Sequence, residues 1–173
     1  MADNTMQRIN DLEIEDATIF SKNFKGAKRV NPKTNKIVNT EGVRGFCVKI
    51  DDIDIAQQML ADGWNVKINK TDDPDEPAFC YLPVEARFNS FPPEINLVTG
   101  NRVVQLDEEH VHQLDDRKFT KVNLIIHPRR YQNDAGDWKI KAFLHEGWFY
   151  LKQSRFAAEW EEHNGGSFED DMY

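Results

Sequence analysis

The chain has few of the features that define several large classes of protein. Among its 173 residues there are only two cysteines, Cys47 and Cys80, and each lies inside an apolar, strand-like run. Cysteines so placed are typical of reduced core residues in a reducing compartment. No stretch approaches the roughly 18 consecutive apolar residues of a membrane helix, and the N-terminus lacks the apolar region of a signal peptide. We therefore expect a soluble, cytoplasmic protein that does not engage a membrane.

Catalytic and metal-binding motifs are also scarce. The sequence has no Gly-rich phosphate loop, no nucleophile elbow and no zinc-hydrolase helix. His110 and His112 would diverge on a helix, and the other histidines lack metal-ligand spacing to the cysteines. The acidic runs 51–54 and 72–76 lack the central glycine and closing glutamate of an EF-hand loop. We expect no enzyme, no cofactor and no bound metal.

The net charge of -8 is distributed unevenly. Residues 157–173 carry six carboxylates and no Lys or Arg, and glycines at 165 and 166 precede the last acidic cluster. This pattern predicts a flexible tail that exposes a short acidic peptide ending on an aromatic residue. The peptide comprises Glu169, Asp170, Asp171, Met172 and Tyr173. A tail that serves solubility alone is the simpler alternative.

The body of the chain is basic in two places. Residues 22–49 hold eight Lys and Arg side chains against Glu41 alone, and residues 118–141 form a second basic stretch. An isoelectric point near 5.1 would argue against nucleic-acid binding if charge were spread evenly. Because the positive charge is clustered, nucleic acid stays a candidate partner.

Alternating apolar residues predict a mostly β chain. We expect a flexible N-terminus over residues 1–16 and a polar, basic loop or hairpin over 29–42. The expected strands cover residues 18–26, 43–50, 64–68, 79–88, 94–98 (a short edge strand), 119–127 and 138–152, the last with a bend at Gly147. Short helices are expected after Asp52 and Asp107, which would act as N-caps. Two small helices are too few to cover a parallel sheet. We therefore predict an OB-type five-stranded Greek-key barrel over residues 17–156, with extra short strands, two short helices and a disordered acidic tail over 157–173.

The last two predicted strands indicate a binding face. Alternation directs Val122, Leu124 and Ile126 inward, with Lys and Phe side chains on the opposite side. Of the consecutive aromatics 148–150, we expect Trp148 or Tyr150 to face the core. The candidate nucleic-acid-binding residues, with 129–131 expected in the loop between the strands, are Phe20, Lys22, Phe24, Lys25, Lys28, Arg29, Lys49, Phe119, Lys121, Arg129, Arg130, Tyr131, Lys139, Lys141 and Phe143.

Cations and exposed rings on one face are the mixture that single-stranded nucleic acid requires. Cations follow the phosphates, and each ring that stacks on an unpaired base contributes about 1–3 kcal/mol. Duplex recognition more often needs a helix that directs Arg, Asn or Gln into a groove, and neither predicted helix has such a face. For each ring taken alone, packing in the core is the alternative to nucleic-acid binding. For the lysines, the alternative is a solvated strand edge that resists aggregation.

Several diffuse motifs give the chain a family resemblance. The motifs are Phe24–Gly26, Gly45–Val48, Asp62–Lys67, Pro92–Pro93 and Lys141–Leu144. Through them the chain resembles, over Ala17 to Phe156, the bacteriophage single-stranded DNA-binding proteins. Its tail is similar to the acidic C-termini of the T7-type phage protein and of bacterial SSB. The tail departs from the usual pattern because it ends on Tyr173 rather than on Phe.

The resemblance implies an OB fold, sequence-tolerant binding of single strands and a tail that recruits replication and recombination proteins. Our hypothesis is a non-catalytic protein that acts in phage DNA replication, recombination and repair in the infected bacterial cell. Its tail would compete with DNA for the basic face, and a homodimer is left open. The alternative is a phage-encoded β-barrel adaptor that binds a host protein without nucleic acid. The two are distinguished by five residues: Phe24, Phe143, Lys121, Lys139 and Lys141. If they line one exposed concave groove, the first is favoured; if the rings are buried and the lysines scattered, the second is.

Overall fold

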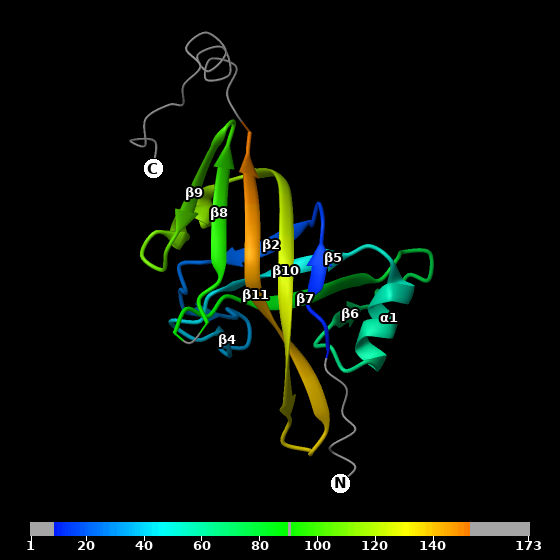
Figure 1. Cartoon of the computed structure of the whole chain (residues 1–173). Coiled ribbons are helices and arrows are strands. Elements are labelled where there is room, and N and C mark those ends of the chain that lie inside the picture. The colour runs from blue at the N-terminus through cyan, green and yellow to red at the C-terminus, as the bar shows by residue number, and fades with distance from the viewer. Residues whose placement is uncertain (1–8, 90, 153–173) are drawn as a thin grey trace.

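The computed structural model describes residues 9–89 and 91–152, and strands dominate them (Figure 1). The strands are β1 Leu12–Ile14, β2 Ile19–Asn23, β3 Arg29–Val30, β4 Ile37–Asn39, β5 Gly45–Ile50, β6 Lys67–Asn69, β7 Phe79–Glu85, β8 Glu94–Thr99, β9 Arg102–Leu106, β10 Phe119–Gln132 and β11 Trp138–Leu151. The helices are α1 Ile53–Ala61 and the 3-10 helix η2 Val111–Asp116. Neither of these two helices has the length and apolar character needed to span a membrane.

In the described residues, the nine-stranded main sheet has the strand order of an OB-type barrel. Its central path runs β10-β11-β7-β5-β2, in which β7 and β11 are parallel and the other neighbours are antiparallel. The chain from β1 to β2 then joins the two open edges. Strand β1 pairs with β10, the amide of Ala17 donates to the carbonyl of Val122 at 2.7 Å, and β2 pairs with β5. This order is that of an OB-type barrel, and the predicted mostly β fold class is confirmed.

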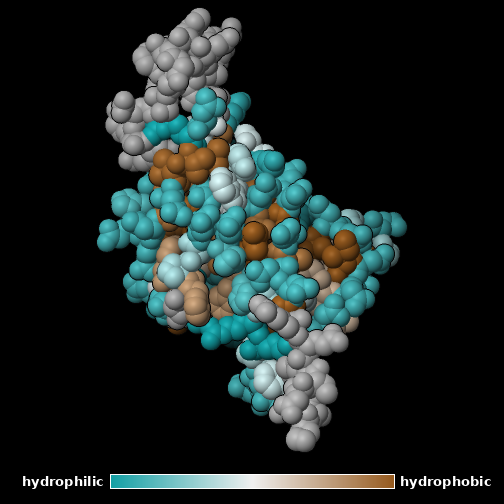
Figure 2. All heavy atoms as spheres, viewed as in Figure 1, coloured by the Kyte–Doolittle hydropathy of each residue, from teal (hydrophilic) through white to brown (hydrophobic). Residues whose placement is uncertain are grey.

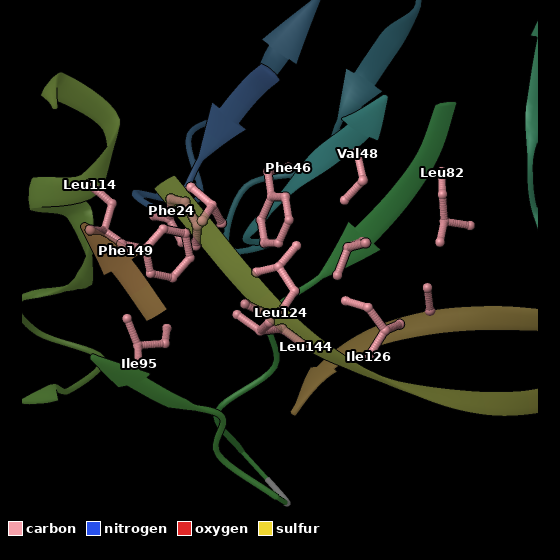
Figure 3. Packing of buried hydrophobic residues seen from close by; sticks show 14 of the residues in the cluster. Phe24, Phe46, Val48, Leu82, Ile95, Leu114, Leu124, Ile126, Leu144 and Phe149 are labelled. Carbon is pink, nitrogen blue, oxygen red and sulfur yellow. The ribbon is translucent and has the colours of Figure 1, made fainter. Parts of the chain in front are cut away.

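A continuous apolar core fills the barrel (Figure 3). Within it, Phe24, Phe46 and Phe149 pack together, with ring centroids 5.4 Å apart for Phe24 and Phe46 and 5.8 Å apart for Phe24 and Phe149. Aliphatic side chains such as Leu82 and Ile126 continue the core, and both are 1 % exposed or less. Because alternate strand residues face opposite sides, this core leaves the intervening rings and cations of β5, β7, β10 and β11 outside.

A β-bulge in β11 changes which residues face the core. The register with β10 passes from Ile125 opposite Glu146 to Ile126 opposite Leu144, which leaves His145 as the extra residue. Before the bulge, even-numbered residues such as Leu144 are buried. After it, the odd-numbered Phe149 is fully buried.

The expectation that Trp148 or Tyr150 faces the core is therefore wrong, since both are only half-buried. The Trp148 indole N–H donates to the Glu146 carboxylate at 2.8 Å. The bend predicted at Gly147 coincides with this irregular region. A Cβ at Gly147 would lie only 2.6 Å from a ring carbon of Phe149, so the glycine leaves room for the buried ring.

Strand β8 is not the edge strand that the two prolines before it suggested. It pairs with β11 on one side and β9 on the other, and Ile95 and Leu97 are fully buried. Sequence reading missed β9, which follows β8 through a turn where Gly100 has a φ of 59°. Within the segment 1–16, predicted to be flexible, Leu12–Ile14 forms β1 on the edge of β10.

The predicted helix signals act largely as expected. The Asp52 carboxylate accepts from the amide of Asp54 at the start of α1. Asp107 caps a turn rather than an α-helix, because the regular segment after it is the 3-10 helix η2.

In Figure 1, the β10–β11 hairpin runs the length of the molecule, with β8 and β9 beside one end and α1 at the side. Figure 2 shows hydrophilic side chains over most of this view, broken by apolar patches.

Candidate nucleic-acid interface

The outward side chains of β2, β5, β7, β11 and β10 form one surface, which we call the outer face. Directly paired residues point to the same side of a sheet, so the register identifies its members. The pairs are Phe20 with Cys47, Lys49 with Tyr81, Glu85 with Phe143, Lys141 with Arg129, and Lys139 with Tyr131. Burial raises the pKa of the Cys47 thiol, which therefore adds no negative charge to this face near neutral pH.

Three rings gather at the β2 end of the outer face, and we call Phe20, Phe79 and Tyr81 the ring platform. Their centroids are 5.3 Å apart for Phe20 and Phe79, 5.4 Å for Phe20 and Tyr81, and 5.7 Å for Phe79 and Tyr81. The Phe79 side is open to solvent, with 40 % of the residue exposed, and the Lys49 ammonium lies 6.0 Å from its ring centroid. The platform can offer edges and faces to unpaired bases.

Sequence reading named Phe20 but missed Phe79 and Tyr81. The signal was present, because alternation along the predicted strand 79–88 directs Cys80 and Leu82 toward the core. Alternation then places Phe79 and Tyr81 on the opposite side, where the structure has them.

Three cations surround a single ring toward the β10 end, and we call Arg87, Arg129 and Lys141 the cation cluster. They lie 5.3, 6.0 and 5.7 Å from the centroid of Phe143. Glu85 joins two of them, with its carboxylate 2.8 Å from the Arg87 guanidinium and 3.0 Å from the Lys141 ammonium. Sequence reading missed both Glu85 and Arg87, since it assigned no role to that strand end.

Two open hollows lie between Tyr81 of the platform and the cation cluster. The first, of about 430 Å³, is lined by Tyr81 and other residues of β2, β4, β5, β7 and β11, together with Arg29. The second, of about 420 Å³, contains the cation cluster, Arg130 and Tyr131. Asn65 and Lys141 line both. Asn65 lies where β7 and β11 diverge, and its backbone N–H donates to the Ile140 carbonyl at 3.0 Å.

Many predicted binding residues meet in this region. The structure brings together Phe20, Arg29, Lys49, Arg129, Arg130, Tyr131, Lys139, Lys141 and Phe143. Residues 129–131 do so from within β10 rather than from a loop, because the hairpin turn begins only after Gln132. Lys25 and Lys28 are exposed but line neither hollow.

Phe24 and Lys22 do not belong to the outer face, which corrects the prediction. Phe24 is fully buried, and Lys22 donates from its ammonium to the carbonyls of Leu114, at 2.8 Å, and Arg117.

The cause of this placement is an irregularity in β2. Ser21 has a φ of 52° and the register shifts between Phe20 and Asn23, so the alternation that would align residues 20, 22 and 24 is broken. Burial lowers the pKa of Lys22.

Phe119 and Lys121 lie in a different part of the surface. The Phe119 ring contacts Phe149, with centroids 5.2 Å apart, and lies under the Lys22 ammonium. Lys121 approaches the ring of Tyr150, at 5.4 Å. Both line a separate hollow that shares no residue with the two on the outer face.

The predicted tail peptide 169–173 lies outside the described residues. Among the residues described, no group of His, Cys, Asp and Glu could hold a metal ion.

The chain matches a family model over residues 1–163, and the family is described as "Putative phage ssDNA-binding domain". The chain therefore belongs to this family. The expected class, a non-catalytic single-stranded DNA-binding protein of phage type, is confirmed by that membership. A search of curated proteins finds no match to the chain.

Among solved structures, the fold is similar to the single-stranded DNA-binding protein from bacteriophage Enc34 in complex with ssDNA. The two are 11 % identical with a TM-score of 0.49, over 85 % of this chain and 89 % of that one. A C-terminal truncation of the Enc34 protein is 12 % identical with a TM-score of 0.49, over 84 % of this chain and 87 % of that one.

Proposed function

We propose that this protein binds single-stranded DNA across its outer face, with little dependence on sequence. Bases would stack on the ring platform, and phosphates would bind the cation cluster. The outer face offers both groups, and two open hollows that share Asn65 and Lys141 lie between Tyr81 of the platform and the cation cluster. This juxtaposition is the observation that carries the proposal. Ring stacking discriminates weakly among bases, because every base has a π-face.

The same arrangement argues against the adaptor alternative. The deciding residues were Phe24, Lys121, Lys139, Lys141 and Phe143. The last three share the outer face, whereas Phe24 is buried and Lys121 lies elsewhere. The outer face nevertheless carries rings and positive charge without Phe24 and Lys121, because Phe79, Tyr81 and Arg87 supply them.

The protein would act during phage DNA replication, recombination and repair, in the cytoplasm of the infected bacterium. The peptide Glu169–Tyr173 would recruit replication or recombination proteins and compete with DNA for the basic groove. Six carboxylates without a compensating cation in residues 157–173 support the second role. Such a segment is attracted to the cations that phosphates use.

Binding to single-stranded and duplex oligonucleotides, measured by fluorescence anisotropy at several salt concentrations, tests the proposal. A labelled oligo(dT) should bind more tightly than a duplex of equal length. The logarithm of its binding constant should fall linearly with the logarithm of salt concentration, by about 0.7 per phosphate contact. A preference for the duplex, or no binding of oligo(dT) at low salt, would reject it.

A further inference from the structure

We infer that Arg87, Arg129 and Lys141 form a phosphate-binding subsite and that Glu85 is a positioning residue beneath it. The inference rests on the proposed function and deepens it. Sequence reading gave neither Glu85 nor Arg87 a role. A carboxylate inside a DNA-binding groove would at first sight repel the ligand, so its geometry decides what it does.

The side chain of Glu85 is much more buried than the two cations that it contacts. Its side chain is 12 % exposed, whereas those of Arg87 and Lys141 are 44 % and 43 % exposed. One carboxylate oxygen accepts from Nε of Arg87 at 3.0 Å and lies 2.8 Å from Nη2 of the same side chain. The other oxygen lies 3.0 Å from Nζ of Lys141. Each oxygen thus contacts one cation, and the carboxylate is much less exposed than either cation.

The two cations keep donors for a second anion. A guanidinium has five N–H donors and an ammonium has three. Glu85 contacts Nε and Nη2 of Arg87 and Nζ of Lys141, so both side chains, each more than two fifths exposed, keep further N–H donors for a second anion. A cation already held from below loses less rotamer freedom when a phosphate binds. Glu85 therefore orders the subsite, and this gain opposes its repulsion of phosphate.

Phe143 gives the cations a second support. All three lie within 6.0 Å of its ring centroid, including Arg129, which comes from the neighbouring strand. Cations over a ring face are attracted to its π-electrons. Because three cations lie around it, the Phe143 ring positions these cations rather than stacking on a base. We assign base stacking to the ring platform. The ligand of the subsite is a phosphodiester, because a guanidinium fork matches two phosphate oxygens.

The charge-neutralising substitution Glu85→Gln separates positioning from repulsion. If Glu85 only repelled phosphate, the variant would bind oligo(dT) more tightly. We expect the opposite: a loss of about tenfold, equivalent to one charge-assisted hydrogen bond. The salt slope should also fall by about 0.7, as one phosphate contact is lost. Asp51→Asn is the matched control, because Asp51 pairs with Lys49 at 3.4 Å but is 80 % exposed. That variant should bind as well as wild type or slightly better.

A second variant tests the same subsite at constant charge. Arg87→Lys keeps the positive charge but removes the fork that Glu85 holds, so it should also weaken binding. The double variant Glu85→Gln/Arg87→Ala should lose less affinity than the sum of the losses in Glu85→Gln and Arg87→Ala, because part of the effect of Glu85 acts through Arg87 and the rest through Lys141. Thermal melting of each variant checks that it folds.

The outcomes distinguish this inference from the proposed function. Wild-type protein that fails to bind oligo(dT) would remove the proposed function itself. Wild-type binding together with equal or tighter binding by Glu85→Gln would overturn the positioning role alone. Unchanged affinity and salt slope in Arg87→Lys would overturn the subsite.

Discussion

The ring of Phe20 on β2 lies edge-on to the ring of Tyr81 on β7, with 5.4 Å between centroids. These strands are not neighbours, since β5 lies between them and pairs with both. The two rings therefore reach across the backbone of β5, and Phe79 completes the cluster at 5.3 Å from Phe20. The ring platform spans three strands, which makes it a property of the folded barrel rather than of one sequence segment.

Substitution of the platform rings should weaken DNA binding more than it affects stability. Phe79→Ala and Tyr81→Ala should each cost about 1–3 kcal/mol of oligo(dT) affinity if each ring stacks on a base. Phe91→Ala is the control, because Phe91 is 89 % exposed and is not one of the platform rings. Anisotropy titrations at fixed salt measure the effect. Equal losses in the platform and control variants would contradict it.

Lys22 should matter for stability and not for DNA affinity. Its ammonium donates to the carbonyls of Leu114 and Arg117, which ties β2 to η2. Lys22→Met removes these donors from part-buried carbonyls, which should lower the free energy of unfolding by about 1–3 kcal/mol. Lys25→Met, at an exposed position, is the control. Urea unfolding and oligo(dT) titration of both variants provide the comparison. A large loss of DNA affinity confined to Lys22→Met would restore its predicted binding role.

The turn before η2 should weaken at acid pH. The hydrogen bond from His110 holds the pKa of Asp107 below its ordinary value of 3.8. A carboxyl with a lowered pKa in the folded state stabilises the fold above its unfolded pKa, and this contribution is lost as pH falls through the folded value. The stability difference between wild type and Asp107→Asn should therefore shrink below pH 3.8. If the difference in unfolding free energy between wild type and Asp107→Asn grew as the pH fell, the prediction would be contradicted.

Deletion of residues 169–173 should tighten DNA binding and weaken partner recruitment. The deleted peptide carries three carboxylates, which compete with phosphates for the same cations. The gain in affinity should be largest at low salt and should fade as salt screens the charges. Titrations of the full-length and truncated chains at two salt concentrations measure this. Equal affinities at low salt would reject the competition and leave recruitment to be tested separately.

Much of the barrel and part of the face could be predicted from alternation. In β10 and the first half of β11, residues such as Leu124 and Ile140 are buried as expected, and Lys141 and Phe143 are outside. These runs have regular register, so a period of two assigns each side chain correctly.

The errors arise where one extra residue changes the phase. The irregularity at Ser21 sends Lys22 and Phe24 away from the outer face, and the bulge at His145 buries Phe149 in place of its neighbours. Bulges depend on pairing with another strand, so a single sequence does not reveal them. Arg87 was missed for a similar reason. It lies beyond the end of β7, and only the sheet brings it to Phe143 on β11.

The central claim is that a single strand of DNA lies on the outer face, and an NMR footprint tests it most directly. Oligo(dT) would be titrated into the labelled chain while backbone amide and aromatic side-chain signals are followed. The account predicts large shifts for Phe79, Tyr81, Arg87, Lys141 and Phe143, and little change for Phe119 or Lys121. Shifts concentrated at Phe119 and Lys121, with the ring platform and cation cluster unaffected, would contradict it.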